Sequence, residues 1–232
     1  LSLFGAYTYN IVENSQYLPT SVWANGQAYK GTKKRESLLG NMMLTYKKNW
    51  KKHFFDVLAL AELQKETYTG YYTTVSNFST DKFGYNNLQA GALRLWEGTN
   101  SYYEQPRLAS FMGRFNYTYA DRYVLTLNAR TDASSKFGAN HKWGFFPSAS
   151  AAWVISEEEF MKQFPVIDNL KFRIGYGLAG NQSGIDSYTT LNLVKPNGVV
   201  PVGNSAIVSL GDLRNTNPDL TWEVKHTFNT GF

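Results

Sequence analysis

Hydrophobic and polar residues alternate along residues 111–131, FMGRFNYTYADRYVLTLNART, and this pattern predicts two β-strands joined by a tight turn. Successive strand side chains point to opposite faces. One predicted face is therefore aromatic and aliphatic, with Phe111, Gly113, Phe115, Tyr117, Tyr119, Tyr123, Leu125, Leu127 and Ala129. The other face is mostly polar, with Met112, Arg114, Asn116, Thr118, Val124, Thr126, Asn128 and Arg130. Such a repeat over about 9–11 residues suits a membrane β-barrel, but a soluble β-sandwich also alternates.

Similar alternation recurs along the whole chain and predicts eight or nine strands in an all-β fold. The predicted strands lie at 1–10, 37–47, 53–68, 107–119, 122–131, 146–156, 170–178 and 220–232, with a weaker one within 188–194.

The predicted connections between these strands alternate between short and long. The short or compact ones are 48–52, 120–122 and 157–169, and the long ones are 11–36, 73–106, 132–144 and 179–219. An antiparallel up-and-down barrel has short turns at one rim and long loops at the other, which gives this order. The order therefore favours a segment of a transmembrane barrel over a Greek-key sandwich.

The turn after Tyr119 can be predicted from the two-residue period of a strand. Paired residues on antiparallel strands point to the same side, so Tyr119 and Tyr123 must pair if both belong to the apolar face. This pairing leaves a loop of three residues, Ala120, Asp121 and Arg122.

Aromatic residues concentrate near the predicted short turns, where rings with one wet edge suit a membrane interface. They are Tyr46, Trp50, Phe54, Tyr117, Tyr119, Tyr123, Trp153 and Phe172. At the start of the short connection 157–169, Ser156 followed by Glu159 has the spacing of a capping box and predicts one short helix.

Composition narrows the possible functions. The chain of 232 residues has no cysteine, 16% aromatic residues and a net charge of +5. The absence of cysteine excludes disulfides and thiol chemistry within these residues. Lysines at 30–35 and 47–52 carry much of the charge, and we assign them to solvated loops and turns. No single-stranded nucleic-acid motif accompanies them, so no nucleic-acid partner is expected.

Two motifs resemble chemical sites but lack the context that such sites need. Residues 175–180 match G-x-G-x-x-G, yet no helix pattern and no acidic residue at the required spacing follow. His53, His141 and His226 are scattered in the sequence and have no convergent acidic partners. We therefore expect no catalytic residue, no metal site, no cofactor and no enzymatic activity.

A denser set of motifs resembles a known family. These motifs are RYVLTLNARTDASSKFG at 122–138, WGFFPSASAAW at 143–153, ISEEEFM at 155–161, LKFRIGYG at 170–177, GN at 180–181 and NPDLTWE at 217–223. Together they resemble the barrel of SusC/RagA-type TonB-dependent outer-membrane transporters. The family usually has Gly where Ala133 stands here, a small departure.

This resemblance implies that residues 1–232 are an interior part of one 22-stranded barrel domain in the bacterial outer membrane. A plug domain and a TonB box would precede Leu1 and are absent from this chain. The expected function is active import of a large nutrient, a glycan or a peptide. The expected partners are a SusD-like surface lipoprotein over the extracellular mouth, outer-membrane lipid, and the TonB complex acting through the plug.

Within this expectation, different residues take different roles. Flat rings in the long loops are candidates for cargo contact, although loop packing or lipoprotein contact would also explain them: Trp96, Tyr102, Tyr103 and Tyr188. Lumen-facing residues are expected to be Arg114, Asn116, Thr126, Asn128 and Arg130, and lipid-facing residues Phe115, Tyr117, Tyr119, Tyr123, Leu125, Leu127 and Trp153.

Two other functions remain open at the level of sequence. A secreted β-sandwich that binds carbohydrate would need closed packing of two sheets within 232 residues. An outer-membrane barrel enzyme or adhesin would need a catalytic cluster or an extended passenger, and the sequence shows neither.

Overall fold

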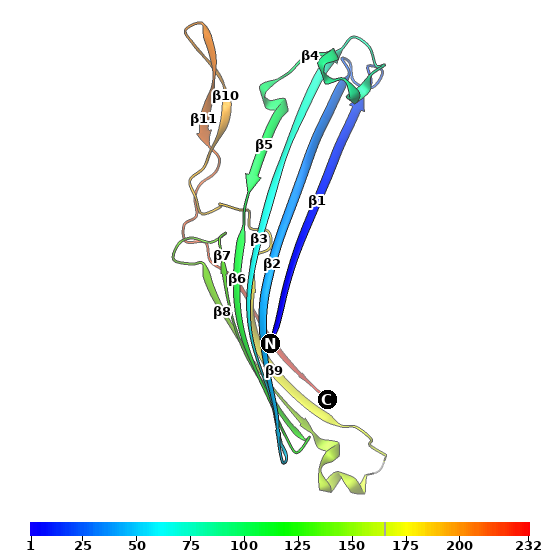
Figure 1. The fold of residues 1–232 in the computed structure, drawn as a ribbon, viewed down its shortest axis with the longest axis vertical. Coiled ribbons are helices and arrows are strands. Elements are labelled where there is room, and N and C mark those ends of the chain that lie inside the picture. The colour runs from blue at the N-terminus through cyan, green and yellow to red at the C-terminus, as the bar shows by residue number, and fades with distance from the viewer. Residues whose placement is uncertain (165) are drawn as a thin grey trace. The chain divides into compact units, whose positions relative to one another are not determined.

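Long antiparallel strands make up most of the fold (Figure 1). The computed structural model describes residues 1–164 and 166–232. Its strands are β1 (Ser2–Leu18), β2 (Gln27–Trp50), β3 (His53–Phe78), β4 (Gly91–Leu93), β5 (Thr99–Glu104), β6 (Arg107–Tyr119), β7 (Tyr123–Ser134), β8 (Trp143–Val154), β9 (Lys171–Asn181), β10 (Val194–Val202), β11 (Ser205–Asp212) and β12 (Glu223–Gly231). The helical turns are all 3-10: η1 (Gly84–Asn86), η2 (Leu88–Ala90), η3 (Trp96–Gly98), η4 (Ile155–Glu157) and η5 (Glu159–Gln163). Among the described residues, no helix has the length and hydropathy needed to cross a membrane.

Strand neighbours follow chain order, as an up-and-down sheet requires. The hydrogen-bonded order is β1-β2-β3-β6-β7-β8-β9-β12, with β4 and β5 pairing with β3 off this path. This path has eight strands and confirms the predicted all-β, antiparallel arrangement. The strands β10 and β11 form a separate two-stranded sheet. A sandwich needs two large stacked sheets, whereas the described residues form one large sheet and this hairpin.

Residue contacts divide the chain into two units. One unit comprises Leu1–Phe4, Gly40–Leu63 and Arg107–Phe232, and its buried cluster is formed by Phe137, Phe146 and Trp222. The other comprises Gly5–Leu39 and Gln64–Pro106, and its buried cluster is formed by Ala28, Val75 and Phe78. Both clusters are small, and most large apolar side chains of the described residues are exposed.

The predicted three-residue turn between β6 and β7 is confirmed. Tyr119 pairs with Tyr123, and the register continues through Tyr117–Leu125 and Phe115–Leu127 without a bulge. Ala120 and Asp121 occupy the left-handed region, with φ of 52° and 57°. The backbone N–H of Arg122 donates to the carbonyl oxygen of Tyr119 at 3.0 Å and closes the turn.

Several strands extend beyond their predicted ends into regions predicted as long loops. β1 continues to Leu18 and β2 begins at Gln27, so residues 19–26 alone separate them. β3 reaches Phe78, and the region predicted as loop 73–106 also contains β4 and β5. These extensions carry polar residues at many positions. Apolar residues do not recur regularly at every second position there, so the alternation that predicts a strand is weak.

Two local predictions are wrong. Residues 188–190 form a turn and residues 191–193 are irregular, so no strand forms there. Tyr188 has φ of 62° and cannot continue an extended chain, and β10 begins only at Val194. The predicted capping box does not form, since Ser156 lies inside η4 and the N-cap of η5 is Glu158, with no side-chain hydrogen bond. Part of the connection 157–169, residue 165, lies outside the described residues.

The loop between β7 and β8 lies very close to the segment before Trp222, and this contact gives a testable prediction. A Cβ atom built on Gly138 would lie 2.0 Å from the carbonyl oxygen of Pro218, whereas a Cβ on Gly113 has no neighbour within 4 Å. Gly138→Ala should therefore destabilise the protein by roughly 1–3 kcal/mol through overpacking, and Gly113→Ala should be nearly neutral. Thermal unfolding of the purified full-length protein measures both, and equal effects would contradict this packing.

Candidate functional site

All seven residues predicted to face lipid lie on one face of the sheet. Strand register pairs Phe115 with Leu127, Tyr117 with Leu125, and Tyr119 with Tyr123. The next strand pair places Trp153 opposite Tyr123. Directly paired residues of antiparallel strands project to the same side. The register thus brings these side chains together, and their contact with lipid stays a prediction.

A row of rings crosses this face at its short-turn end. Neighbouring ring centroids lie 5.6 Å apart for Trp50–His53, 5.0 Å for His53–Tyr119, 6.3 Å for Tyr119–Tyr123 and 6.4 Å for Tyr123–Trp153. His53 Nδ1 also lies 2.8 Å from the hydroxyl oxygen of Tyr117. No role was predicted for His53 from sequence, and the structure places it inside this row because it opens β3 directly after the turn from Trp50.

The five residues predicted to face the lumen lie on the opposite face. Arg114 pairs with Asn128 and Asn116 with Thr126, while Arg130 pairs with Met112. Asn128 Nδ2 donates to Ser148 Oγ at 3.1 Å, so this polar face continues onto β8. Its contact with cargo or with a plug stays a prediction.

Arg130 is held by a partner that sequence analysis assigned to a loop. Its Nε donates to both carboxylate oxygens of Asp132, at 2.8 and 3.1 Å, and its Nη2 donates to Ser110 Oγ at 3.2 Å. Asp132 and Ser110 are buried, with exposed fractions of 6% and 1%. The i, i+2 spacing of Arg130 and Asp132 on one strand face could have revealed this pair, had β7 been predicted to its full length.

The motifs that carry the family resemblance converge in one aromatic cluster. The Trp222 ring lies 4.7 Å from the ring of Phe137 and 5.4 Å from that of Phe146, between centroids. Trp222 Nε1 donates to the carbonyl oxygen of Lys142 at 3.0 Å, which satisfies its buried polar edge. Three motifs that are far apart in the sequence therefore form a single packed unit, named here the Trp222 cluster.

A cavity of about 520 Å³ opens between the Trp222 cluster and the polar face. Its apolar wall includes Phe146, Leu178 and Trp222, and its polar wall includes Asn128, Arg130, Asp132, Ser148, Asn181 and Gln182. Gln182 Oε1 is buried in this wall and has no hydrogen-bond partner. The cavity mixes apolar surface with amide and hydroxyl groups, as binding sites for small polar molecules do.

The four loop aromatics predicted to contact cargo do not form one group. Tyr102 and Tyr103 are consecutive on β5, opposite Gly70 and Thr69 of β3, and consecutive strand residues point to opposite faces. Trp96 begins η3 in the same unit, whereas Tyr188 lies in the other unit within a turn. A single stacking platform built from Tyr102 and Tyr103 is therefore excluded.

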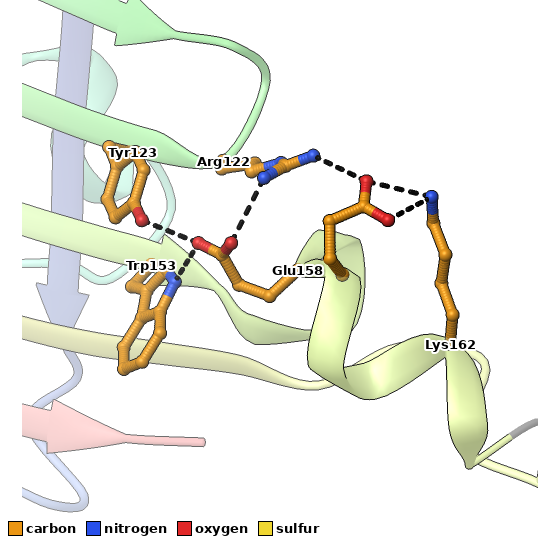
Figure 2. Close-up of polar contacts among 6 residues, drawn as sticks. Arg122, Tyr123, Trp153, Glu158 and Lys162 are labelled. Atoms are coloured by element: carbon orange, nitrogen blue, oxygen red, sulfur yellow. Dashed lines mark hydrogen bonds and ion pairs between the residues drawn. The ribbon is translucent and has the colours of Figure 1, made fainter.

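Glu158 forms a polar clamp at the short-turn end, between η4 and η5 (Figure 2). Its carboxylate accepts hydrogen bonds from Tyr123 Oη at 2.5 Å, Trp153 Nε1 at 3.0 Å and Arg122 Nη1 at 3.0 Å. The Tyr123 and Trp153 hydrogen bonds, followed by the Arg122 charge, lower the pKa of Glu158. The clamp joins the turn before β7 and the last ring of the aromatic row to the connection after β8.

The described residues contain no group of three or more His, Asp or Glu side chains placed to bind a metal ion. Asp132 is engaged by Arg130, and His141 lies 3.8 Å from an exposed carboxylate of Asp219 on the surface.

The clamp predicts a dependence of stability on pH. The pKa of Glu158 is lower in the folded protein than in the unfolded chain. The contribution of this carboxylate to folding stability is therefore complete above the ordinary glutamate pKa of about 4.3 and is lost as the pH falls below that value. Glu158→Gln should lower the unfolding temperature at pH 7 and reduce the further loss at acid pH. Thermal unfolding of the full-length protein across pH 3–7 measures this effect. Glu157→Gln, a change at the exposed neighbouring residue, is the control, and an identical pH profile for both variants would contradict the clamp.

Comparison with known proteins shows what this arrangement is similar to. The sequence model described as TonB dependent receptor-like, beta-barrel matches residues 1–232. TonB-dependent receptor P3 of Formosa agariphila is 34% identical over 228 residues, which cover 94% of this chain and 22% of that protein. TonB-dependent receptor SusC of Bacteroides thetaiotaomicron is 30% identical over 242 residues, again covering 94% of this chain and 22% of that protein. The chain thus spans about a fifth of the length of these relatives.

Solved structures of RagAB show the same fold. A structure of the RagAB peptide transporter superposes with a TM-score of 0.81 at 22% identity, over 98% of this chain and 25% of that one. The open-open state of the RagAB peptide importer gives a TM-score of 0.67, over 99% of this chain and 25% of that one.

Proposed function

The chain belongs to the TonB-dependent receptor-like β-barrel family, and from that premise we propose that it forms part of the wall of an outer-membrane transporter that imports a large nutrient. The family is one of outer-membrane barrels. Import is an activity of the whole transporter, of which these residues match about a fifth. The separation of an apolar from a polar face along β6, β7 and β8 is the observation that carries the proposal.

The apolar face fits a wall in contact with lipid. Leu125, Leu127 and Tyr123 are 37%, 43% and 45% exposed although they are apolar or aromatic and lie mid-sheet or at its end. Contact of these side chains with lipid tails costs no free energy, whereas their exposure to water is unfavourable. The Trp222 cluster and the Arg130–Asp132 pair lie on the opposite face of the sheet, which we assign to the lumen.

The cargo and partners are proposed from the relatives. The solved RagAB structures are of a peptide transporter and importer, and SusC is a curated receptor of the same family. We propose a glycan or a peptide as cargo, a SusD-like lipoprotein at the extracellular mouth, and energy from TonB through a plug that belongs to the full-length protein. The proposed role of these 232 residues is structural and binding, without catalysis.

The lipid-contact proposal predicts opposite results for neighbouring positions on β7. Leu127→Arg places a charge on the apolar face and should destabilise the folded barrel by about 2–4 kcal/mol near the bilayer midplane. Asn128→Arg places the same charge on the polar face and should be tolerated. Urea unfolding of the full-length protein in lipid vesicles compares the two variants. Equal destabilisation, or a larger effect at Asn128, would exclude this orientation of the wall.

Import itself is tested in a strain that lacks the full-length gene. We expect that strain to lose growth on at least one member of a panel of oligosaccharides and peptides supplied as sole carbon source, and the intact gene to restore it. A variant without the TonB box should fail to restore growth, because the transporter could no longer receive energy from TonB. Unchanged growth on every member of a panel that the parent strain consumes would contradict the proposed function.

A further inference from the structure

We propose that three lysines where β2 turns into β3, Lys48, Lys51 and Lys52, bind the phosphate of an anionic phospholipid in the periplasmic leaflet of the outer membrane. These lysines are named here the basic turn. The inference rests on the proposed function, because it assumes that the apolar face of the sheet meets lipid. Sequence analysis assigns the lysines to solvated loops and turns, and the structure adds the row of rings directly beside them.

Positive charge is concentrated where β2 turns into β3. Residues 47–55 include four lysines and no acidic residue. Lys47 lies 3.8 Å from Asp56, whereas the other three, which make up the basic turn, have no carboxylate partner among the described residues. Asp121, in the neighbouring turn, is exposed and pairs with none of them. The basic turn therefore presents three cationic groups without a counter-charge from these residues.

The backbone fixes the basic turn at the end of the sheet. β2 ends at Trp50 and β3 begins at His53, so Lys51 and Lys52 alone form the connection, and Lys51 has φ of 55°. The carbonyl oxygen of Lys52 accepts a hydrogen bond of 2.7 Å from the N–H of Ala120, which ties this connection to the turn between β6 and β7. The backbone thus holds the charged positions in place, while their side chains are exposed.

The aromatic row begins next to these charges. Lys48 lies between Tyr46 and Trp50 in the alternation along β2, so all three side chains belong to one face. The Trp50 ring stacks on His53 with centroids 5.6 Å apart, and the row continues from His53. Tyr46 and Trp50 are 58% and 61% exposed, so a ligand can reach this face. Accessible rings and an accessible ammonium group therefore lie together at the edge of the apolar face.

The position of the basic turn indicates a lipid headgroup as its ligand. Rings with one wet edge suit the boundary between the hydrocarbon layer and the headgroups. Tyr123 Oη and Trp153 Nε1 both donate to Glu158 at the short-turn end, so polar edges of the row point out of the apolar band. Short turns of outer-membrane barrels lie at the periplasmic rim, beside the phospholipid leaflet. A lysine can reach a phosphate there while its methylene groups stay against apolar surface.

Charge decides between the possible ligands. Unpaired ammonium groups attract an anionic headgroup such as that of phosphatidylglycerol, and each lysine near an anionic surface contributes roughly a fivefold gain in affinity. Phosphatidylethanolamine carries an ammonium group of its own, which the lysines repel. A soluble anion would gain the charge attraction but no contact with the rings. Rings and charges together therefore favour an anionic phospholipid over a zwitterionic lipid or a free phosphate.

Lipid binding by the purified full-length protein tests the site. The protein in detergent would be titrated with phosphatidylglycerol and with phosphatidylethanolamine of the same acyl chains, and bound lipid measured by native mass spectrometry. We expect tighter binding of phosphatidylglycerol. The combined change Lys48→Gln, Lys51→Gln and Lys52→Gln should weaken that binding by roughly ten- to a hundredfold. Arginine at the same three positions keeps the charge and should keep the preference.

A matched control removes the same charge from another part of β2. The combined change Lys30→Gln, Lys33→Gln and Lys34→Gln, at lysines that are also exposed, should bind as the wild type does. The site is overturned if the wild type binds both lipids equally, if the control loses as much affinity as the basic-turn variant, or if the arginine variant loses the preference. It is also overturned if soluble glycerophosphoglycerol displaces the lipid at equal concentration, since that result would indicate a site for a free anion.

These outcomes are separate from failure of import. The basic-turn variant can restore growth of the strain that lacks the full-length gene and still lose its preference for phosphatidylglycerol. Conversely, the wild type can show the lipid preference in detergent even if no member of the nutrient panel depends on the gene.

Discussion

The rest of the structure depends on one constraint, the pairing of backbone N–H and C=O groups between neighbouring strands. A lipid environment offers no alternative partner, so every strand of a wall must be paired along its membrane-embedded length. The continuous register from β6 through β7 to β8, without a bulge, meets this requirement. Because this register has no bulge, side chains alternate between the two faces of the sheet without interruption. The apolar face is therefore separated from the polar face.

This constraint explains which features could be predicted from sequence. The turn after Tyr119 was predictable because the two-residue period of a strand allows only certain loop lengths once both faces are assigned. The pairing of Tyr119 with Tyr123 confirms the prediction. Strand order was predictable because the connections alternate in length. The extensions of β1 and β2 were missed because polar side chains hide the repeat there. The turn at Tyr188 was missed because its left-handed backbone gives no signal in residue type.

The candidate site was harder to predict because its residues come together from distant segments. Phe137, Phe146 and Trp222 lie in three separate motifs, and their ring contacts follow from the path of the chain after β9, which local alternation does not determine. That Gln182 Oε1 is buried without a hydrogen-bond partner likewise depends on tertiary packing. The four loop aromatics, chosen for residue type alone, are dispersed between two units and across two faces of β5.

The proposed wall requires one face of β7 to meet lipid and the other face to meet water. Spin labels on single cysteines test this directly, since the 232 residues contain no cysteine of their own. Labels at Leu125→Cys and Thr126→Cys in the full-length protein, reconstituted in vesicles, would be probed by molecular oxygen, which enters lipid, and by a water-soluble nickel chelate. With this orientation of β7, we expect oxygen to reach the label at 125 and the chelate to reach the label at 126. Equal access at both positions, or the reverse order, would contradict it.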